Sequence, residues 1–203
     1  DWRICFSDYI PKIAVLVSKA EHCLYDILAR QEMGELGAEI SLIISNHGDL
    51  EKIAKDFGVE FFSLPAQEIS KNKNEALILE KLKEHNIDLV ILARYMQILS
   101  PNFVRCYPNK IINIHHSFLP SFAGAKPYHQ AHERGVKIIG ATAHYVTRDL
   151  DAGPIIEQDV TRISHRDSVE DLVRKGKDLE KIVLARAINL HLRNRVLVYN
   201  NKT

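Results

Sequence analysis

The sequence predicts an α/β fold: an open, mostly parallel sheet flanked by helices. Short runs that are apolar on both faces recur along the chain, a pattern typical of strands buried between layers of helices. Between them lie longer stretches with apolar residues at helical spacing and charges elsewhere. The regular alternation of the two patterns favours parallel strands joined by crossover helices.

In chain order, the apolar runs predict strands at 13–17, 40–44, 61–64, 89–93 and 111–114. Amphipathic stretches predict helices at about 22–32, 50–57 and 73–85. Gly58 and Pro65 stand where a helix should stop and a strand should end. The segment His115–Gln130 contains Pro120, Gly124 and Pro127 and is predicted to be a long loop, and long ordered loops are often functional.

Two more strands are expected at 138–146 and 154–163, followed by a helix. Ser168 and Asp171 form the S-x-x-D pattern of a helix cap, and the amphipathic run that follows reaches about Asn194. Its charge-rich part, Arg174–Lys181, is interpreted as a solvated face. Without repeats or a linker, residues 12–203 are expected to form one domain.

Composition excludes several classes of function. The 203 residues carry 27 basic and 26 acidic side chains, so no overall field would gather nucleic acid. The apolar runs are too short to cross a bilayer, and no signal peptide is visible at the start. Cys5, Cys23 and Cys106 are an odd number without close spacing, which indicates reduced thiols and a cytoplasmic location.

Candidate chemistry gathers around the predicted loop. Asn113 and His115 lie two residues apart and so share one face of a strand, at the carboxyl end where open α/β sheets place their sites. The pair Gly153–Pro154 forces a turn that would present Asp151 at the sheet edge. An amide, an imidazole and a carboxylate suit transfer of a carbonyl group. The amide and imidazole would stabilise an oxyanion, and the carboxylate would take a proton from the nucleophile.

Other interpretations stay open from the residues alone. His129 and His132 have the spacing of a metal pair and with His115 could bind zinc, although no carboxylate or thiolate completes the motif. Arg94, Tyr95 and Met96 could simply begin a helix. A binding protein without turnover is the rival from another class, but a pure binder would not need the amide, imidazole and carboxylate together.

Several motifs resemble the folate-dependent formyltransferase fold, a Rossmann-like α/β fold. They are Asn113-Ile114-His115, Ser117-Phe118-Leu119-Pro120, His144 and Leu150-Asp151-Ala152-Gly153-Pro154. The resemblance implies that Asn113, His115 and Asp151 are catalytic and that His144 supports them. It implies folate-binding roles for Arg94, Tyr95, Met96, Gln97, Ile98, Leu99, Thr147 and Leu150. Gly124, Lys126 and His129 would form a substrate loop or only order it.

Within this family the sequence resembles that of the formyltetrahydrofolate deformylases, notably in residues 17–24, 92–101, the doublet His115-His116 and 124–131. These enzymes hydrolyse 10-formyltetrahydrofolate to formate and tetrahydrofolate, feeding formate to purine synthesis and balancing one-carbon pools. The alternative is formyl transfer to an amine such as glycinamide ribonucleotide. That reaction needs a phosphate cradle after the first strand, and the turn Ser18–His22 has no glycine and an acidic residue. Water is then the expected nucleophile.

The resemblance carries further expectations. The folate is the substrate, so no metal or bound cofactor is implied, and no nucleic acid or membrane is an expected partner. The resemblance to these hydrolases also implies self-association, so the chain is expected to form a homo-oligomer. They also carry a regulatory ACT domain ahead of the catalytic part, and residues 1–11 resemble the junction that would follow it.

Overall fold

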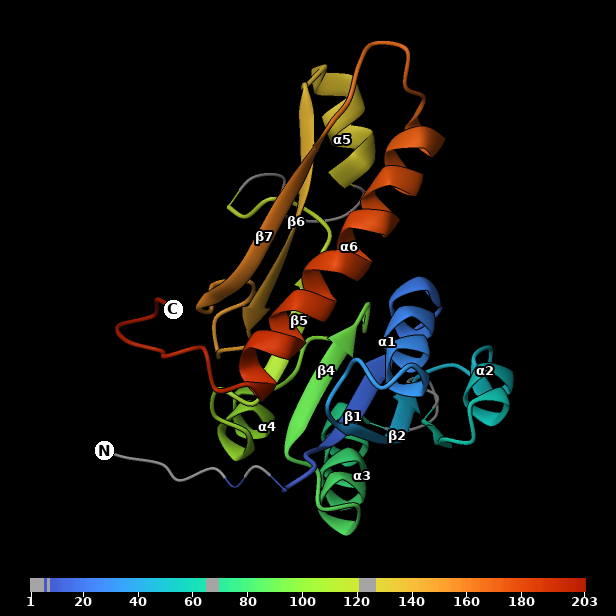
Figure 1. Cartoon of the computed structure of the whole chain (residues 1–203), viewed down its shortest axis with the longest axis vertical. Helices are drawn as coiled ribbons and strands as arrows, with labels where there is room; N and C mark the ends of the chain where they lie inside the picture. The colour runs from blue at the N-terminus through green and yellow to red at the C-terminus, as the bar shows by residue number, and fades with distance from the viewer. Residues whose placement is uncertain (1–5, 7, 65–69, 121–126) are drawn as a thin grey trace.

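The computed structural model describes residues 6, 8–64, 70–120 and 127–203. Its centre is one sheet in the order β3-β2-β1-β4-β5-β6-β7 (Figure 1). The first five strands pair in parallel and the last two are antiparallel to their neighbours, which confirms the predicted fold class. The strands are β1 Lys12–Val17, β2 Glu39–Ser45, β3 Glu60–Ser63, β4 Leu89–Ala93, β5 Ile111–His115, β6 Ile138–Tyr145 and β7 Ile155–Arg162.

The helices are α1 His22–Glu32, α2 Glu51–Asp56, α3 Lys71–Glu84, α4 Pro101–Cys106, α5 Pro127–Arg134 and α6 Val169–Leu192. The prediction that His115–Gln130 is entirely loop was wrong at its end, because α5 starts at Pro127. Proline is well tolerated in a first helical turn, and Tyr128 and Ala131 give that helix a short buried stripe. The sequence reading also missed α4, where the Ser100 hydroxyl accepts a hydrogen bond from the Phe103 N–H.

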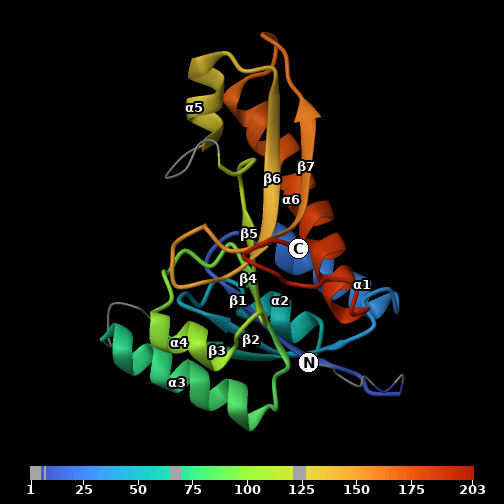
Figure 2. The same cartoon turned by 90° about the vertical axis from the view of Figure 1, so that its left-hand side faces the viewer.

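Helices cover both faces of the sheet (Figures 1 and 2). Side chains of α1, α2 and α6 join one core cluster with one face of the strands, and side chains of α3 and α4 join a second cluster on the other face. Strands buried on both faces must be apolar on both faces, which explains the continuous apolar runs of β1 and β4.

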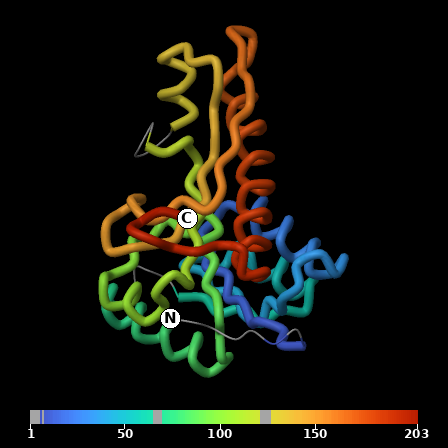
Figure 3. Tube along the Cα trace, turned by 60° about the vertical axis from the view of Figure 1, so that its left-hand side comes forward, coloured from blue at the N-terminus to red at the C-terminus, as the bar shows by residue number. Residues whose placement is uncertain are grey.

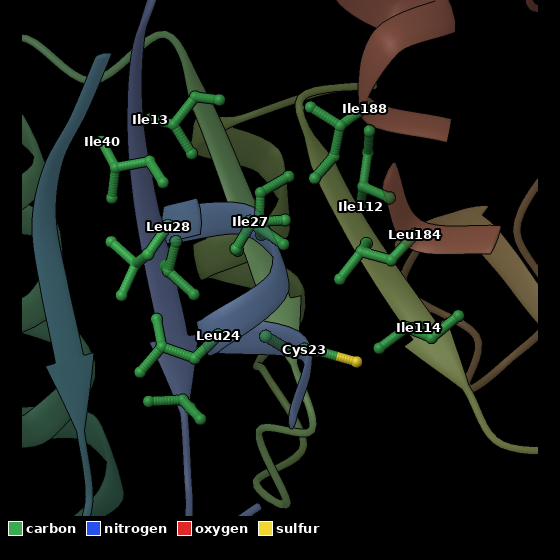
Figure 4. Packing of buried hydrophobic residues seen from close by; sticks show 14 of the residues in the cluster. Ile13, Cys23, Leu24, Ile27, Leu28, Ile40, Ile112, Ile114, Leu184 and Ile188 are labelled. Carbon is green, nitrogen blue, oxygen red and sulfur yellow. The ribbon is translucent and has the colours of Figure 1, made fainter. Parts of the chain in front are cut away.

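Strand β5 departs from this rule. Ile112 and Ile114 point into the first core cluster, near Leu184 and Ile188 of α6 (Figure 4). Because side chains alternate along a strand, Asn113 and His115 then face the opposite side. The polar face of β5 is therefore fixed by the burial of its two isoleucines.

Helix α6 is the long element that ties the molecule together. Its capping box, with Ser168 and Asp171 bonding each other's backbone N–H groups, confirms the predicted start. From there it runs beside the β6–β7 hairpin and reaches α1, with α5 packed near its beginning (Figures 1 and 3). No helix among the described residues is long and apolar enough to span a membrane.

Candidate active site

A cavity of about 360 Å³ opens beside the carboxyl ends of β4 and β5, within the size range of small-molecule sites. The segment after β4 forms one wall, β5 and the end of β6 form the base, and the loop between β6 and β7 forms the other wall. The lining residues are Leu92, Arg94, Tyr95, Met96, Gln97, Ile98, Leu99, Asn113, Ile114, His115, His116, His144, Val146, Thr147, Arg148, Asp149, Leu150 and Asp151.

Asn113 and His144 meet at the base of this cavity. They are opposite each other in the β5–β6 ladder, and the Asn113 Nδ2 lies 3.2 Å from the His144 Nε2. His144 Nδ1 lies 2.9 Å from the carbonyl oxygen of Tyr145, which can only accept a hydrogen bond. Nδ1 therefore carries the proton, and in the neutral ring Nε2 accepts from the amide of Asn113. A shift in the β6–β7 register between Ala143 and His144 marks an irregularity where this side chain is positioned.

Asp151 completes the group from the β6–β7 loop. Its carboxylate lies 3.4 Å from His115 Nδ1 and 3.6 Å from His144 Nε2, with 25% of the side chain exposed. The hydrogen bond from His115 is the largest cause that holds the pKa of Asp151 well below its usual range, against the opposing effect of burial. Asp151 adopts a left-handed backbone conformation with φ of 52°, which follows from the turn ending at Gly153.

The two histidines at the end of β5 differ in environment. His115 is buried, its Nδ1 faces Asp151, and its Nε2 has no hydrogen-bond partner among the residues described. The His116 ring lies 5.4 Å from that of His115 and 6.0 Å from that of Tyr128. Burial, and next the charge of Arg94, lower the pKa of His116 to about 4, so His116 is neutral at neutral pH.

Behind the cavity lies a buried carboxylate that the sequence reading misplaced. Glu180 falls within Arg174–Lys181, predicted as a solvated face, yet its side chain is only 1% exposed. It accepts hydrogen bonds from Tyr128 Oη at 2.6 Å and from His22 Nε2 at 2.8 Å, and it lies 3.5 Å from Arg94 Nη1. Although burial raises it, the hydrogen bond from His22 and the charge of Arg94 bring the pKa of Glu180 below its usual value.

A local signal for this burial was present. Glu180 belongs to the apolar stripe of α6, where Gly176, Leu179, Val183 and Leu184 recur at helical spacing and are buried. A charge inside such a stripe is buried only with partners, and those partners come from α1, α5 and the segment after β4.

The structure brings Asn113, His115, His144 and Asp151 together, as the sequence predicted. All eight residues expected to bind folate line the same cavity. Gly124 and Lys126 lie outside the described residues. His129 is on α5 rather than in a loop, its side chain is exposed, and it does not line the cavity.

The hypothetical zinc trio is not assembled, since His129 and His132 are exposed on α5 whereas His115 is buried. Across the described chain, the set whose potential ligand atoms do converge is His22, Cys23 and Glu180, within 4.8 Å of one another. Two of these side chains already share a hydrogen bond, and the cation of Arg94 stands beside them.

The turn after β1 is committed to internal contacts. The Ser18 hydroxyl donates to Asn46 Oδ1 at 2.6 Å and accepts from the Met96 N–H at 3.0 Å. Glu21 occupies the N-cap of α1 without a side-chain hydrogen bond, and His22 is held by Glu180. This turn lacks the glycine-rich backbone that cradles a phosphate, as the sequence indicated.

A doubly wound sheet with an amide, two imidazoles and a carboxylate converging at the carboxyl ends of its strands defines an enzyme of the formyltransferase fold. The formyl transferase family matches residues 11–188. A formyltetrahydrofolate deformylase of Synechocystis is 62% identical over the whole of this chain and 71% of its own length.

Solved structures agree with this comparison. A deformylase from Pseudomonas syringae pv. tomato has a TM-score of 0.97 at 52% identity, covering all of this chain and 68% of that one. Glycinamide ribonucleotide transformylase 1 from Symbiobacterium toebii has a TM-score of 0.90 at 34% identity, covering 99% and 96%. The chain belongs to the formyl transferase family, among its formyltetrahydrofolate deformylases.

Proposed function

We propose that this enzyme hydrolyses 10-formyltetrahydrofolate to formate and tetrahydrofolate. The observation that carries the proposal is the convergence of Asn113, His115, His144 and Asp151 in one cavity whose walls contain all the expected folate-binding residues. The deformylases that cover the whole chain at high identity support the same activity.

The amide of Asn113 serves as one donor to the formyl oxygen, and His115 serves as the second donor when both of its ring nitrogens carry protons. One N–H of the Asn113 amide is directed at His144 Nε2, which leaves the other free for the cavity. His115 Nε2 is a buried ring nitrogen without a partner in the described part of the chain. As water adds, negative charge grows on the formyl oxygen, and preorganised donors stabilise it more than they stabilise the ground state.

Asp151 serves as the proton acceptor. Its lowered pKa keeps the carboxylate ionised, so it is a weak base towards free water. Water becomes far more acidic once its oxygen bonds to the formyl carbon, and the proton can then pass to Asp151. The same negative charge also stabilises a protonated His115, 3.4 Å away.

Collapse of the adduct completes the reaction. The bond between the formyl carbon and N10 breaks, its electron pair stays on N10, and N10 takes a proton from His115 or Asp151. The released acid loses its proton to give formate. One water molecule is consumed, and no oxidant, reductant or metal is needed for this balance.

Hydrolysis rather than transfer is favoured by the turn after β1, because Ser18 and His22 are engaged in internal hydrogen bonds and no phosphate cradle is present. The test is release of formate from 10-formyltetrahydrofolate with and without glycinamide ribonucleotide. We expect the same rate in both, with no formylated acceptor. Turnover that requires the acceptor would identify a transferase instead, and absence of turnover would indicate a binder.

Self-association and a cytoplasmic location are part of this proposal. The β6–β7 end of the molecule exposes Ile138 and Val160, 48% and 41% accessible, next to Phe118 at 40%, and such a patch favours contact between copies. Light scattering of the purified chain at several concentrations tests it, and a monomer throughout would contradict it.

A further inference from the structure

The side chain of Arg94 stands out in the cavity wall. Its Nε and Nη1 atoms are buried and have no hydrogen-bond partner among the described residues. Arginine is always charged, and its N–H groups are costly to leave unpaired away from water. The guanidinium is therefore suited to bind, reversibly, a ligand that accepts hydrogen bonds.

The charge of Arg94 is balanced from behind without satisfying its donors. Glu180 lies 3.5 Å from Nη1, too far for a strong hydrogen bond, and its oxygens already accept from Tyr128 and His22. Glu180 does not line the cavity, whereas Arg94 does. The carboxylate of Glu180 thus stabilises the buried cation, while the N–H groups of Arg94 remain available to a ligand.

The backbone gives an independent sign of function. Arg94 has φ of 62°, in the left-handed region that a residue with a long side chain rarely adopts. Such strain persists where the surrounding structure enforces a particular side-chain position, and it is concentrated at ligand sites. Here the conformation comes directly after β4, at the end of the strand beside β5.

The cavity offers a second unpaired group of the same kind. His115 Nε2 is buried, lacks a described partner, and lines the same cavity as Arg94. The His116 ring lies 5.4 Å from that of His115 and lines the same cavity. A small ligand with two acceptor oxygens would pair with the guanidinium and, when both ring nitrogens of His115 carry protons, with its Nε2–H as well.

We propose that Arg94 is the binding group for the formate product, pairing through its planar N–H donors with the oxygen derived from water. This inference rests on the proposed hydrolysis, which creates a planar carboxylate beside His115. Arginine matches a carboxylate in shape and charge, and a charge balanced by Glu180 binds the anion without holding it permanently.

The experiment uses sodium formate as the probe at constant ionic strength. Formate affinity is measured directly by NMR titration of ¹³C-formate, and separately as product inhibition of hydrolysis. Arg94→Gln is expected to weaken formate binding by about tenfold or more, the size of a lost charge-assisted pair. Arg94→Lys keeps the charge that Glu180 requires, and so the fold, but is expected to bind severalfold more weakly because the planar pair of donors is lost.

The matched control is Arg148→Gln. Arg148 lines the rim of the same cavity with 80% of its side chain exposed, so this change removes an equal charge from the same neighbourhood. Its formate affinity should stay within about twofold of the unmodified protein. Equal weakening of formate binding in the two Gln variants would show that only the general positive charge of the cavity matters, which would contradict the proposal. Unchanged formate affinity in Arg94→Lys or Arg94→Gln would overturn it as well.

The two readouts separate this inference from the proposed function. If the protein hydrolyses the substrate but its formate affinity does not depend on Arg94, the inference is refuted and the proposed function stands. Formate binding that depends on Arg94 without any hydrolysis would refute the proposed function and leave an anion site. Thermal unfolding of each variant confirms that the protein tested is folded.

Discussion

Asn113 and His144 face each other across neighbouring antiparallel strands, with the amide nitrogen 3.2 Å from the imidazole Nε2. The backbone carbonyl of Tyr145 fixes the proton on the other ring nitrogen, so the imidazole accepts and the amide donates. This contact determines which end of the Asn113 side chain faces the substrate. A reversed amide would present an oxygen to the developing oxyanion and oppose it.

His144→Gln is expected to lower kcat about tenfold to hundredfold with little change in KM, because the Asn113 amide loses its orientation without losing the folate pocket. Steady-state kinetics of His144→Gln, Asn113→Ala and the double variant check this. The double variant should be hardly slower than Asn113→Ala alone. Losses that simply multiply would show that His144 does not act through Asn113.

Asp151→Asn is expected to reduce kcat by about 100-fold or more, since the amide can neither accept the proton from water nor stabilise a charged His115. The variant keeps the shape of the side chain, so tetrahydrofolate affinity should change little. Formate release and folate binding are measured on the same preparation. A loss within tenfold would remove Asp151 from the role of base.

His116 should make the protein less stable in mild acid. Its pKa falls from 6.5 in the unfolded chain to about 4 in the folded protein, so between these values the unfolded state binds the extra proton. The contribution of neutral His116 to the free energy of unfolding is intact above pH 6.5. It is lost as the pH falls towards 4, at up to about 1.4 kcal/mol per pH unit.

Urea unfolding from pH 7.5 to 4.5 measures this slope. His116→Gln should flatten it, whereas His132→Gln, which removes an exposed histidine from α5, should leave it as it was. A slope that survives in His116→Gln would assign the acid sensitivity to other groups.

Gly176→Ala should disrupt the site from a distance. A Cβ at Gly176 would lie 2.1 Å from Tyr128 Oη and 2.2 Å from its Cζ, so the tyrosine must move and its hydrogen bond to Glu180 breaks. We expect a loss of about 1–3 kcal/mol in the free energy of unfolding, measured in denaturant. In a Tyr128→Ala background the same glycine substitution should cost less, and equal stability of Gly176→Ala and the parent would contradict the packing described.

The sequence by itself determined the sheet and most of the site. Period-two alternation placed Asn113 and His115 on one face of β5, and the turn at Gly153–Pro154 placed Asp151 near them, because these are local properties of the chain. The resemblance marked the residues after β4 and β6, all of which line the cavity. The short helix α5 was not predicted from the sequence, because one turn of buried residues is a weak periodic signal.

Only the tertiary structure decided the fate of Glu180 and Arg94. Whether a charge is buried depends on its partners, and the partner of Glu180 on α1, His22, lies 158 residues away in the sequence. The left-handed backbone of Arg94 is likewise enforced by packing and not by its residue type. Local periodicity records which face of an element is covered, but long-range contacts decide which charges that face can hold.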